Sequence, residues 1–143
     1  MSNDKSLTVS KTINADKETI FNALTDERTM AKWFFAGPDG WSATVKSDSK
    51  KGGSYKIDMY NGEGETYSHT GEYKEVTPYD KIVFSWNSQA VTDTLVTITL
   101  SEVDGGTEVK LMHEFMPNDQ QVENHTSGWT MILERLAGVS VAI

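Results

Sequence analysis

The hydrophobic pattern changes period once along the chain, and this change constrains the fold more than any other feature. Between Trp41 and Phe115, apolar and polar residues mostly alternate in short runs, which is typical of half-buried strands. After Pro117, apolar residues recur every three or four positions, as on one face of a helix. A helix of about 25 residues is about 37 Å long. Because this is much longer than an average strand, a sheet that buries it must curve around it.

Ahead of this region the sequence predicts one strand and two short helices. Residues 7–13 alternate as in a strand, and residues 16–24 place their apolar side chains on one helical face. Met30, Trp33 and Phe34 then repeat at helical spacing, so a second short helix is expected to end before the turn at residues 37–40.

Six strands are expected between residues 41 and 115, separated by turns rich in glycine and asparagine. Gly71 lies in the middle of the strand predicted over residues 65–76, where a glycine indicates a bulge or a bend. Such a bend would help the sheet to curl. The last strand is expected to place four side chains on one face: Val109, Leu111, His113 and Phe115.

The C-terminal helix is expected to begin at Pro117 or Asn118 and to contain one unusual residue, Gly128. Glycine inside a helix costs about 1 kcal/mol relative to alanine. Gly128 therefore indicates either a tight packing contact with the sheet backbone or room left for a ligand.

This order of elements predicts an α+β helix-grip fold, with a curved antiparallel sheet of six to seven strands around the long helix and two short helices after strand one. A chain of 143 residues fits a single domain, 1–143. The absence of cysteine excludes disulfides and thiolate zinc sites, and the net charge of -8 disfavours nucleic acid and anionic membranes as partners. With neither a leader pattern nor a long apolar run, a soluble cytoplasmic protein is expected.

Short motifs in a fixed order resemble the family of homologues of the activator of the heat shock protein 90 ATPase, within the START-like (SRPBCC) superfamily that includes birch pollen allergen. They extend over essentially the whole chain: ALTD (23–26), KWF (32–34), GGSY (52–55), GEY (71–73), TP (77–78) leading to FSW (84–86), GTEV (106–109) and HTSGW (125–129). The resemblance implies a cavity between the sheet and the C-terminal helix and no shared catalytic residues. It also implies a chaperone as a possible partner, although this chain lacks the additional chaperone-binding domain of those activators.

The three histidines, His69, His113 and His125, are the candidate polar groups. They belong to three separate elements without a short ligand spacing, so no metal site and no cofactor are predicted. His113 is either a core histidine that bonds a neighbour or a polar contact to a ligand. His125 is expected to face the same space as Trp129, because residues i and i+4 share a helix face, and it either supports the structure or contacts a ligand.

Inward-facing aromatic residues are the strongest candidates for a binding surface, because they combine a large apolar area with an N–H or O–H group. Each one alone is as compatible with a filled core. Trp33 and Phe34 are expected at the mouth of the cavity, with residues 35–41 as a flap. The predicted cavity residues are Trp33, Phe34, Trp41, Tyr55, Tyr73, Trp86, His113, His125 and Trp129.

The leading functional hypothesis is a small-molecule or lipid-binding domain with a hydrophobic cavity, acting as a monomer or homodimer and not as an enzyme. One alternative is a co-chaperone-like interaction module that stimulates a chaperone ATPase. Another is a cyclase or hydrolase that acts on a substrate bound in the cavity, with His113 and His125 as its acid-base groups. No nucleophile elbow or phosphate-binding loop is found in the sequence.

Overall fold

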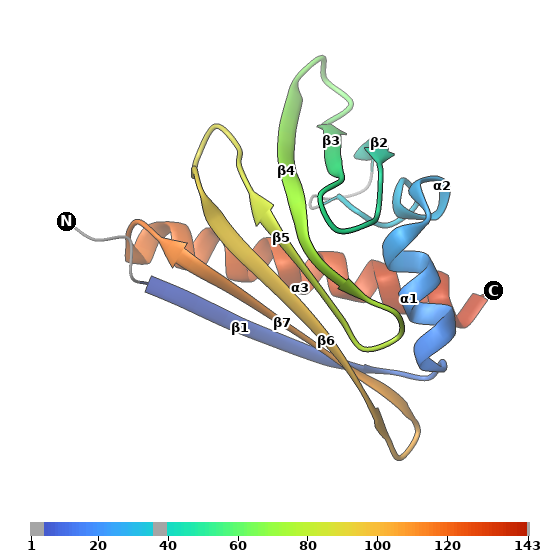
Figure 1. The fold of residues 1–143 in the computed structure, drawn as a ribbon. Coiled ribbons are helices and arrows are strands. Elements are labelled where there is room, and N and C mark those ends of the chain that lie inside the picture. Colours follow the sequence, from blue (N-terminus) through green and yellow to red (C-terminus); the bar gives the residue numbers. More distant parts are fainter. Residues whose placement is uncertain (1–4, 36–39, 143) are drawn as a thin grey trace.

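A computed structural model describes residues 5–35 and 40–142, which form one antiparallel sheet and three helices. Strand β1 is followed by two short helices, six further strands and the long helix α3, around which the sheet curves (Figure 1). The elements are β1 (Lys5–Ile13), α1 (Lys17–Thr25), α2 (Glu27–Met30), β2 (Ser42–Ser47), β3 (Ser54–Tyr60), β4 (Thr66–Thr77), β5 (Lys81–Trp86), β6 (Thr94–Val103), β7 (Gly106–Met116) and α3 (Asp119–Ala142).

The seven strands have the order β1-β7-β6-β5-β4-β3-β2, and every neighbouring pair is antiparallel. Each strand from β2 to β6 therefore pairs with the next one in the sequence, while β1 forms the far edge of the sheet beside β7. The predicted helix-grip fold is confirmed, with one curved sheet, two short helices after the first strand and a long C-terminal helix. At 24 residues α3 is about 36 Å long, and it runs across one face of the sheet (Figure 1).

Strand β4 changes its pairing partner near Gly71, the position at which the sequence predicts a bulge or a bend. Its first part pairs with β3 as far as Glu72, and its second part pairs with β5 from Tyr73 onward. A Cβ atom at Gly71 would lie 1.9 Å from the carbonyl oxygen of Ser85. Only glycine allows the two backbones to approach so closely. The close approach lets the sheet fold over α3.

Strand β7 contains a bulge near its end, and the prediction that Phe115 faces inward is therefore wrong. Leu7 pairs with His113, whereas Lys5 pairs with Met116, so β7 has one extra residue over this stretch. Phe115 takes up the extra length with a positive φ of 66° and is 46% exposed. Met116 is fully buried in its place.

Side-chain caps define where the helices begin. The carboxylates of Asp16 and Asp26 accept hydrogen bonds from the Thr19 and Thr29 amides, at 2.8 and 3.1 Å, and the side chain of Asn118 accepts one from the Gln121 amide at 2.9 Å. Helix α2 is shorter than predicted and ends at Met30.

The chain continues beyond α2 in turns, and the Phe34 amide donates to the Met30 carbonyl at 2.8 Å. Arg135 of α3 donates to the carbonyl oxygen of Phe35 at 3.1 Å, and its guanidinium lies 4.5 Å from the centre of that ring. Most of the predicted turn at residues 37–40, and of the flap that contains it, lies outside the described residues.

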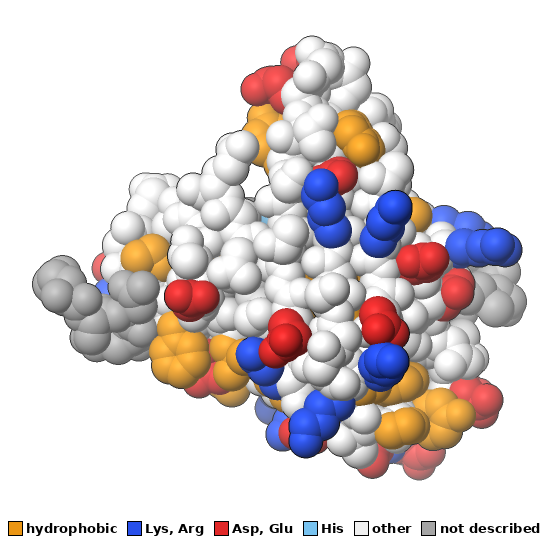
Figure 2. Space-filling view, turned by 45° about the horizontal axis from the view of Figure 1, so that its top comes forward, with side chains coloured by type: hydrophobic (Ala, Val, Ile, Leu, Met, Phe, Trp, Pro, Cys, Tyr) orange, Lys and Arg blue, Asp and Glu red, His pale blue; other side chains and the backbone are white. Residues whose placement is uncertain are grey.

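On the face of the molecule that Figure 2 shows, lysine side chains are interspersed with aspartate and glutamate. Among the described residues, Lys74 forms an ion pair with Glu72 at 2.9 Å within β4, and Lys81 of β5 pairs with Glu75 of β4 at 3.8 Å. The excess of acidic residues is thus not gathered into one patch on this face. None of the described helices has the length and apolarity needed to cross a membrane.

Candidate functional site: a pocket beside the N-terminal half of helix α3

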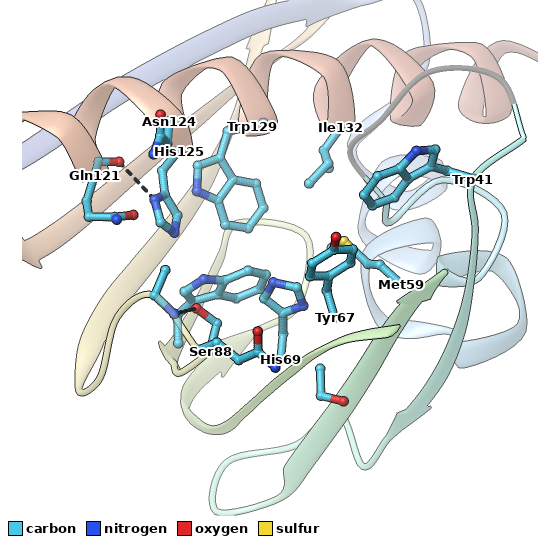
Figure 3. Close-up of a pocket in the computed structure, with 15 residues that line it drawn as sticks. Trp41, Met59, Tyr67, His69, Ser88, Gln121, Asn124, His125, Trp129 and Ile132 are labelled. Atoms are coloured by element: carbon cyan, nitrogen blue, oxygen red, sulfur yellow. Dashed lines mark hydrogen bonds between the residues drawn. The ribbon is translucent and has the colours of Figure 1, made fainter. Parts of the chain in front are cut away.

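A pocket of about 640 Å³ lies between the sheet and the N-terminal half of α3 (Figure 3). This volume falls within the range of about 300 to 1,000 Å³ that is usual for ligand pockets. Side chains come from α3, from strands β3, β4 and β5, and from two loops. The wall consists of Trp41, Met59, Tyr67, Ser68, His69, Trp86, Ser88, Gln89, Ala90, Gln121, Asn124, His125, Gly128, Trp129 and Ile132.

Helix α3 provides one complete wall of the pocket. Its six pocket residues follow one another at intervals of one or three positions, so they share one helical face: Gln121, Asn124, His125, Gly128, Trp129 and Ile132. His125 and Trp129 project toward the sheet in Figure 3. Gly128 lies between these two residues in the sequence and also lines the pocket.

The opposite wall is aromatic and comes from the sheet and the segment before β2. Trp41 stacks on Tyr67, with ring centres 5.5 Å apart and planes 10° from parallel. His69 lies against Trp86 at 4.7 Å, and Trp86 contacts Trp129 of α3 at 4.9 Å. Trp86 thus connects the sheet wall to the helix wall.

Two buried polar atoms on this wall have no hydrogen-bond partner among the described residues, namely Nε1 of Trp86 and Nδ1 of His69. Trp86 is only 3% exposed. An indole N–H can only donate, and a buried donor without an acceptor costs about 1 to 3 kcal/mol. Such atoms are rare in native structures. Both atoms are shielded from the pocket space, so they belong to the interior of the wall.

His125 offers a hydrogen-bond acceptor on the helix wall of the pocket. Its Nδ1 lies 2.8 Å from the carbonyl oxygen of Gln121, so Nδ1 carries the proton and donates (Figure 3). In the neutral ring Nε2 is then an acceptor, and it makes no hydrogen bond to a described residue. Burial lowers the pKa of His125, which favours the neutral form.

His113 is fully buried behind the pocket and links α3 to the sheet. Nε1 of Trp129 donates to Nδ1 of His113 at 2.9 Å, so the His113 proton is on Nε2. Nε2 lies 2.8 Å from the hydroxyl oxygen of Thr94 and donates to it, and Thr94 in turn donates to the Trp86 carbonyl at 2.7 Å. This chain of bonds joins the Trp129 indole of α3 to the backbone of Trp86 in β5. Burial, with a smaller effect of His125, lowers the pKa of His113 to about 3.

Beyond Trp86, the space between sheet and helices is filled, and we call this region the packed end. It is defined by Trp33, Phe34, Tyr55, Tyr73 and Phe84 and is next to α1 and α2. A void of only about 10 Å³ remains there, about enough for one water molecule.

The polar atoms of the packed end have partners. Nε1 of Trp33 donates to the Ala23 carbonyl at 3.0 Å, and the Tyr55 hydroxyl donates to the Ser85 carbonyl at 2.6 Å. The Tyr73 hydroxyl lies 2.7 Å from the hydroxyl of Ser47. These aromatic residues therefore behave as a satisfied core.

The nine residues predicted from the sequence thus divide between the two regions. Trp41, Trp86, His125 and Trp129 line the pocket. Trp33, Phe34, Tyr55 and Tyr73 lie at the packed end, and His113 lies behind the wall with both ring nitrogens bonded.

Several pocket residues were missed, although the helical period from His125 would have found those on α3. The loop residues gave no periodic signal. The missed residues are Met59, Ser68, Ser88, Gln89, Ala90, Gln121, Asn124 and Ile132. Tyr67 and His69, an inward aromatic residue and a candidate polar group in the sequence, also line the pocket.

The histidines do not form a metal site in the part of the chain that the structure describes. His113 and His125 are close, with ring centres 5.2 Å apart. No group of three or more histidine, aspartate or glutamate side chains is placed among the described residues to hold an ion.

A curved antiparallel sheet that closes against one long C-terminal helix, with a pocket between them, defines the helix-grip class of START-like proteins. The model of the family described as "Activator of Hsp90 ATPase homolog 1-like protein" matches residues 14–140, so the chain belongs to this family. Among curated proteins no match is found.

Solved structures share the fold over almost the whole chain. A protein from Chromobacterium violaceum is 26% identical with a TM-score of 0.85, over 94% of this chain and 96% of its own. The AHSA1 protein from Silicibacter pomeroyi is 22% identical with a TM-score of 0.82, over 94% and 96%. The AHSA1-like protein from Aeromonas hydrophila is 19% identical with a TM-score of 0.81, over 96% and 93%. Family and fold are therefore established together.

Proposed function

We propose that this protein binds an apolar small molecule or lipid in the pocket between the sheet and α3. The observation that supports the proposal is the pocket itself, about 640 Å³ with aromatic side chains on both walls. Burying about 200 Å² of apolar surface contributes about 5 kcal/mol at 25 cal/mol/Å². A ligand of two or three rings would bury more, so we expect micromolar affinity after the costs of association.

The test uses methyl naphthyl ketone as a probe and follows the fluorescence of the pocket tryptophans. Gly128→Leu places a side chain on the helix wall of the pocket and should raise the Kd at least about tenfold. The matched control is Gly138→Leu, in the same helix, because a side chain there meets open space. Both changes gain helix propensity, about 0.8 kcal/mol, and only the first should affect binding. Equal binding by wild type and Gly128→Leu, or none by wild type, would refute the proposal.

The chaperone partner and the enzymatic alternative remain predictions of the resemblance. A pull-down with a purified Hsp90-type chaperone, followed by its ATPase rate, tests the first directly. If the chaperone binds and the ketone does not, the interaction module replaces the binding protein as the better account. Turnover of a bound ligand would instead support the enzyme and contradict the expectation that this chain is not one.

A further inference from the structure

The wall of the pocket carries no fixed charge. None of the described residues that line it is lysine, arginine, aspartate or glutamate. Burial lowers the pKa of both wall histidines, His69 and His125, below the ordinary value of 6.5, so both rings are neutral near pH 7. A ligand would therefore be held here by apolar contact and by hydrogen bonds between uncharged groups.

One half of the pocket, which we call the apolar half, is lined by Trp41, Met59, Tyr67 and Ile132 (Figure 3). Met59 of β3 is paired with Tyr67 of β4, and Trp41 stacks on Tyr67. Ile132 lies seven residues after His125 in α3, which is about 10 Å along the helix axis. The apolar half thus faces the part of α3 that is farther from its first turn.

The other half, which we call the polar half, is lined by Ser88, Gln121, Asn124 and His125 (Figure 3). Two of these side chains already have partners within the protein. The hydroxyl oxygen of Ser88 accepts from the Ala90 amide at 3.1 Å, and the side-chain oxygen of Asn124 accepts from the Gln120 side chain at 3.0 Å.

His125 differs because one of its ring nitrogens is anchored and the other is open to the pocket. Nδ1 donates to the Gln121 carbonyl at 2.8 Å, which fixes the ring and leaves Nε2 as an acceptor only. Nε2 has no partner among the described residues and, unlike Nε1 of Trp86, is not shielded from the pocket space. The ring projects from α3 toward the sheet wall in Figure 3. A ligand can therefore reach this lone pair.

We infer that the pocket selects a ligand whose apolar body carries an uncharged hydrogen-bond donor, such as a hydroxyl group, that donates to Nε2 of His125. This inference rests on the proposed function and specifies its ligand class and orientation. The donor lies in the polar half, and the body contacts Trp41, Met59 and Tyr67. A ketone oxygen can only accept, so it would place its lone pairs against that of Nε2.

Three probes with the same naphthyl body and a two-carbon substituent test this selection by titration calorimetry at pH 7: naphthylethanol, methyl naphthyl ketone and ethylnaphthalene. The alcohol and the ketone both lose water from an oxygen on binding, but only the alcohol can donate. We expect the alcohol to bind about 3- to 10-fold more tightly than the ketone, which is the size of effect that one satisfied hydrogen bond gives. The hydrocarbon reports the apolar contribution alone.

Two variants of neighbouring residues then assign the contact. His125→Phe keeps a ring but removes the acceptor, and it should bring the ratio of alcohol to ketone affinity close to one by weakening the alcohol. Thr126→Val is the control, because the Thr126 hydroxyl donates to the Val122 carbonyl at 2.6 Å and Thr126 is not a wall residue. Its ratio should equal that of wild type.

The ¹⁵N signal of His125 Nε2 gives a second measurement on the wild-type protein. A nitrogen that accepts a hydrogen bond changes its shielding, so naphthylethanol should shift this signal more than the ketone does. A spectrum that shows Nε2 protonated at pH 7 would overturn the inference.

The outcomes separate this inference from the proposed function. If none of the three probes binds to wild type, the proposed function fails and the inference falls with it. If the probes bind but alcohol and ketone bind equally, the inference alone is overturned. A preference for the alcohol that survives in His125→Phe, or is lost in Thr126→Val, also overturns it. Should His125→Phe fail to fold, the wild-type affinities and the Nε2 signal still decide.

Discussion

The two ends of the space between sheet and α3 use the same residue types with opposite results. At the packed end, tryptophan, phenylalanine and tyrosine fill the interior, and the N–H and O–H groups of Trp33, Tyr55 and Tyr73 have partners. At the pocket end, aromatic rings surround about 640 Å³ of space, and Nε1 of Trp86 and Nδ1 of His69 have no partner among the described residues. An aromatic residue in this fold therefore stabilises the core or lines a pocket according to where the sheet closes on the helices.

The largest effect on the free energy of unfolding is expected from a substitution at the packed end. Trp33 is 1% exposed, stacks on Phe34 at 4.7 Å and donates to the Ala23 carbonyl. Trp33→Ala should lower the free energy of unfolding by about 3 to 5 kcal/mol, because a cavity and an unpaired carbonyl remain. Urea denaturation measures this loss. A loss below about 1 kcal/mol would mean that this end is not tightly packed.

Acid should weaken the connection between α3 and the sheet. A histidine has a pKa near 6.5 when unfolded, and burial lowers the pKa of His113 to about 3 in the folded protein. The unfolded state therefore binds the extra proton between these values, so the stability is complete above about pH 6.5 and is lost as the pH falls toward 3. Between about pH 7 and pH 5, His113 alone should cost about 2 kcal/mol. The lowered pKa values of His69 and His125 act with the same sign.

The control for this pH dependence is His113→Gln, which keeps a donor and an acceptor but cannot titrate. Its free energy of unfolding, from urea curves at several pH values, should change less between pH 7 and pH 5 than that of wild type. A wild-type stability that is constant over this interval would contradict the role of His113 as a buried, neutral link.

The smallest expected effect on stability belongs to the pocket end. Trp41 stacks on Tyr67 at the pocket wall and is only partly buried. Trp41→Ala should cost about 1 to 2 kcal/mol, because water can enter the space that the ring leaves. Its affinity for methyl naphthyl ketone should nevertheless fall about tenfold, since a large contact area is lost. If Trp41→Ala costs as much stability as Trp33→Ala, the two ends do not differ as we describe.

The sequence predicted the fold well because the alternation in the strands and the spacing of three or four residues in the helix both follow from which side of each element is buried. The same periods could not divide the aromatic residues between the two ends. Tyr55 and Trp86 both face inward and are both buried, yet Tyr55 lies at the packed end and Trp86 lines the pocket.

Two further features of β7 were beyond the reach of the periodic pattern. The alternation of the last strand predicts that Phe115 faces inward. One bulge residue reverses this alternation, and the bulge has no signal in the sequence pattern. His113 was expected as either a core residue or a ligand contact, and its two bonds, to Trp129 and Thr94, depend on residues 16 and 19 positions away in the chain. Long-range partners of this kind cannot be read from periodicity.

The contrast between the two ends is tested most directly by the four tryptophan indole N–H signals in a two-dimensional ¹H–¹⁵N spectrum of the wild-type protein. We predict that titration with methyl naphthyl ketone shifts the signals of Trp41, Trp86 and Trp129, which line the pocket, and leaves that of Trp33 in place. Shifts of equal size at all four indoles, or at Trp33 alone, would contradict the division of this fold into a packed end and a binding pocket.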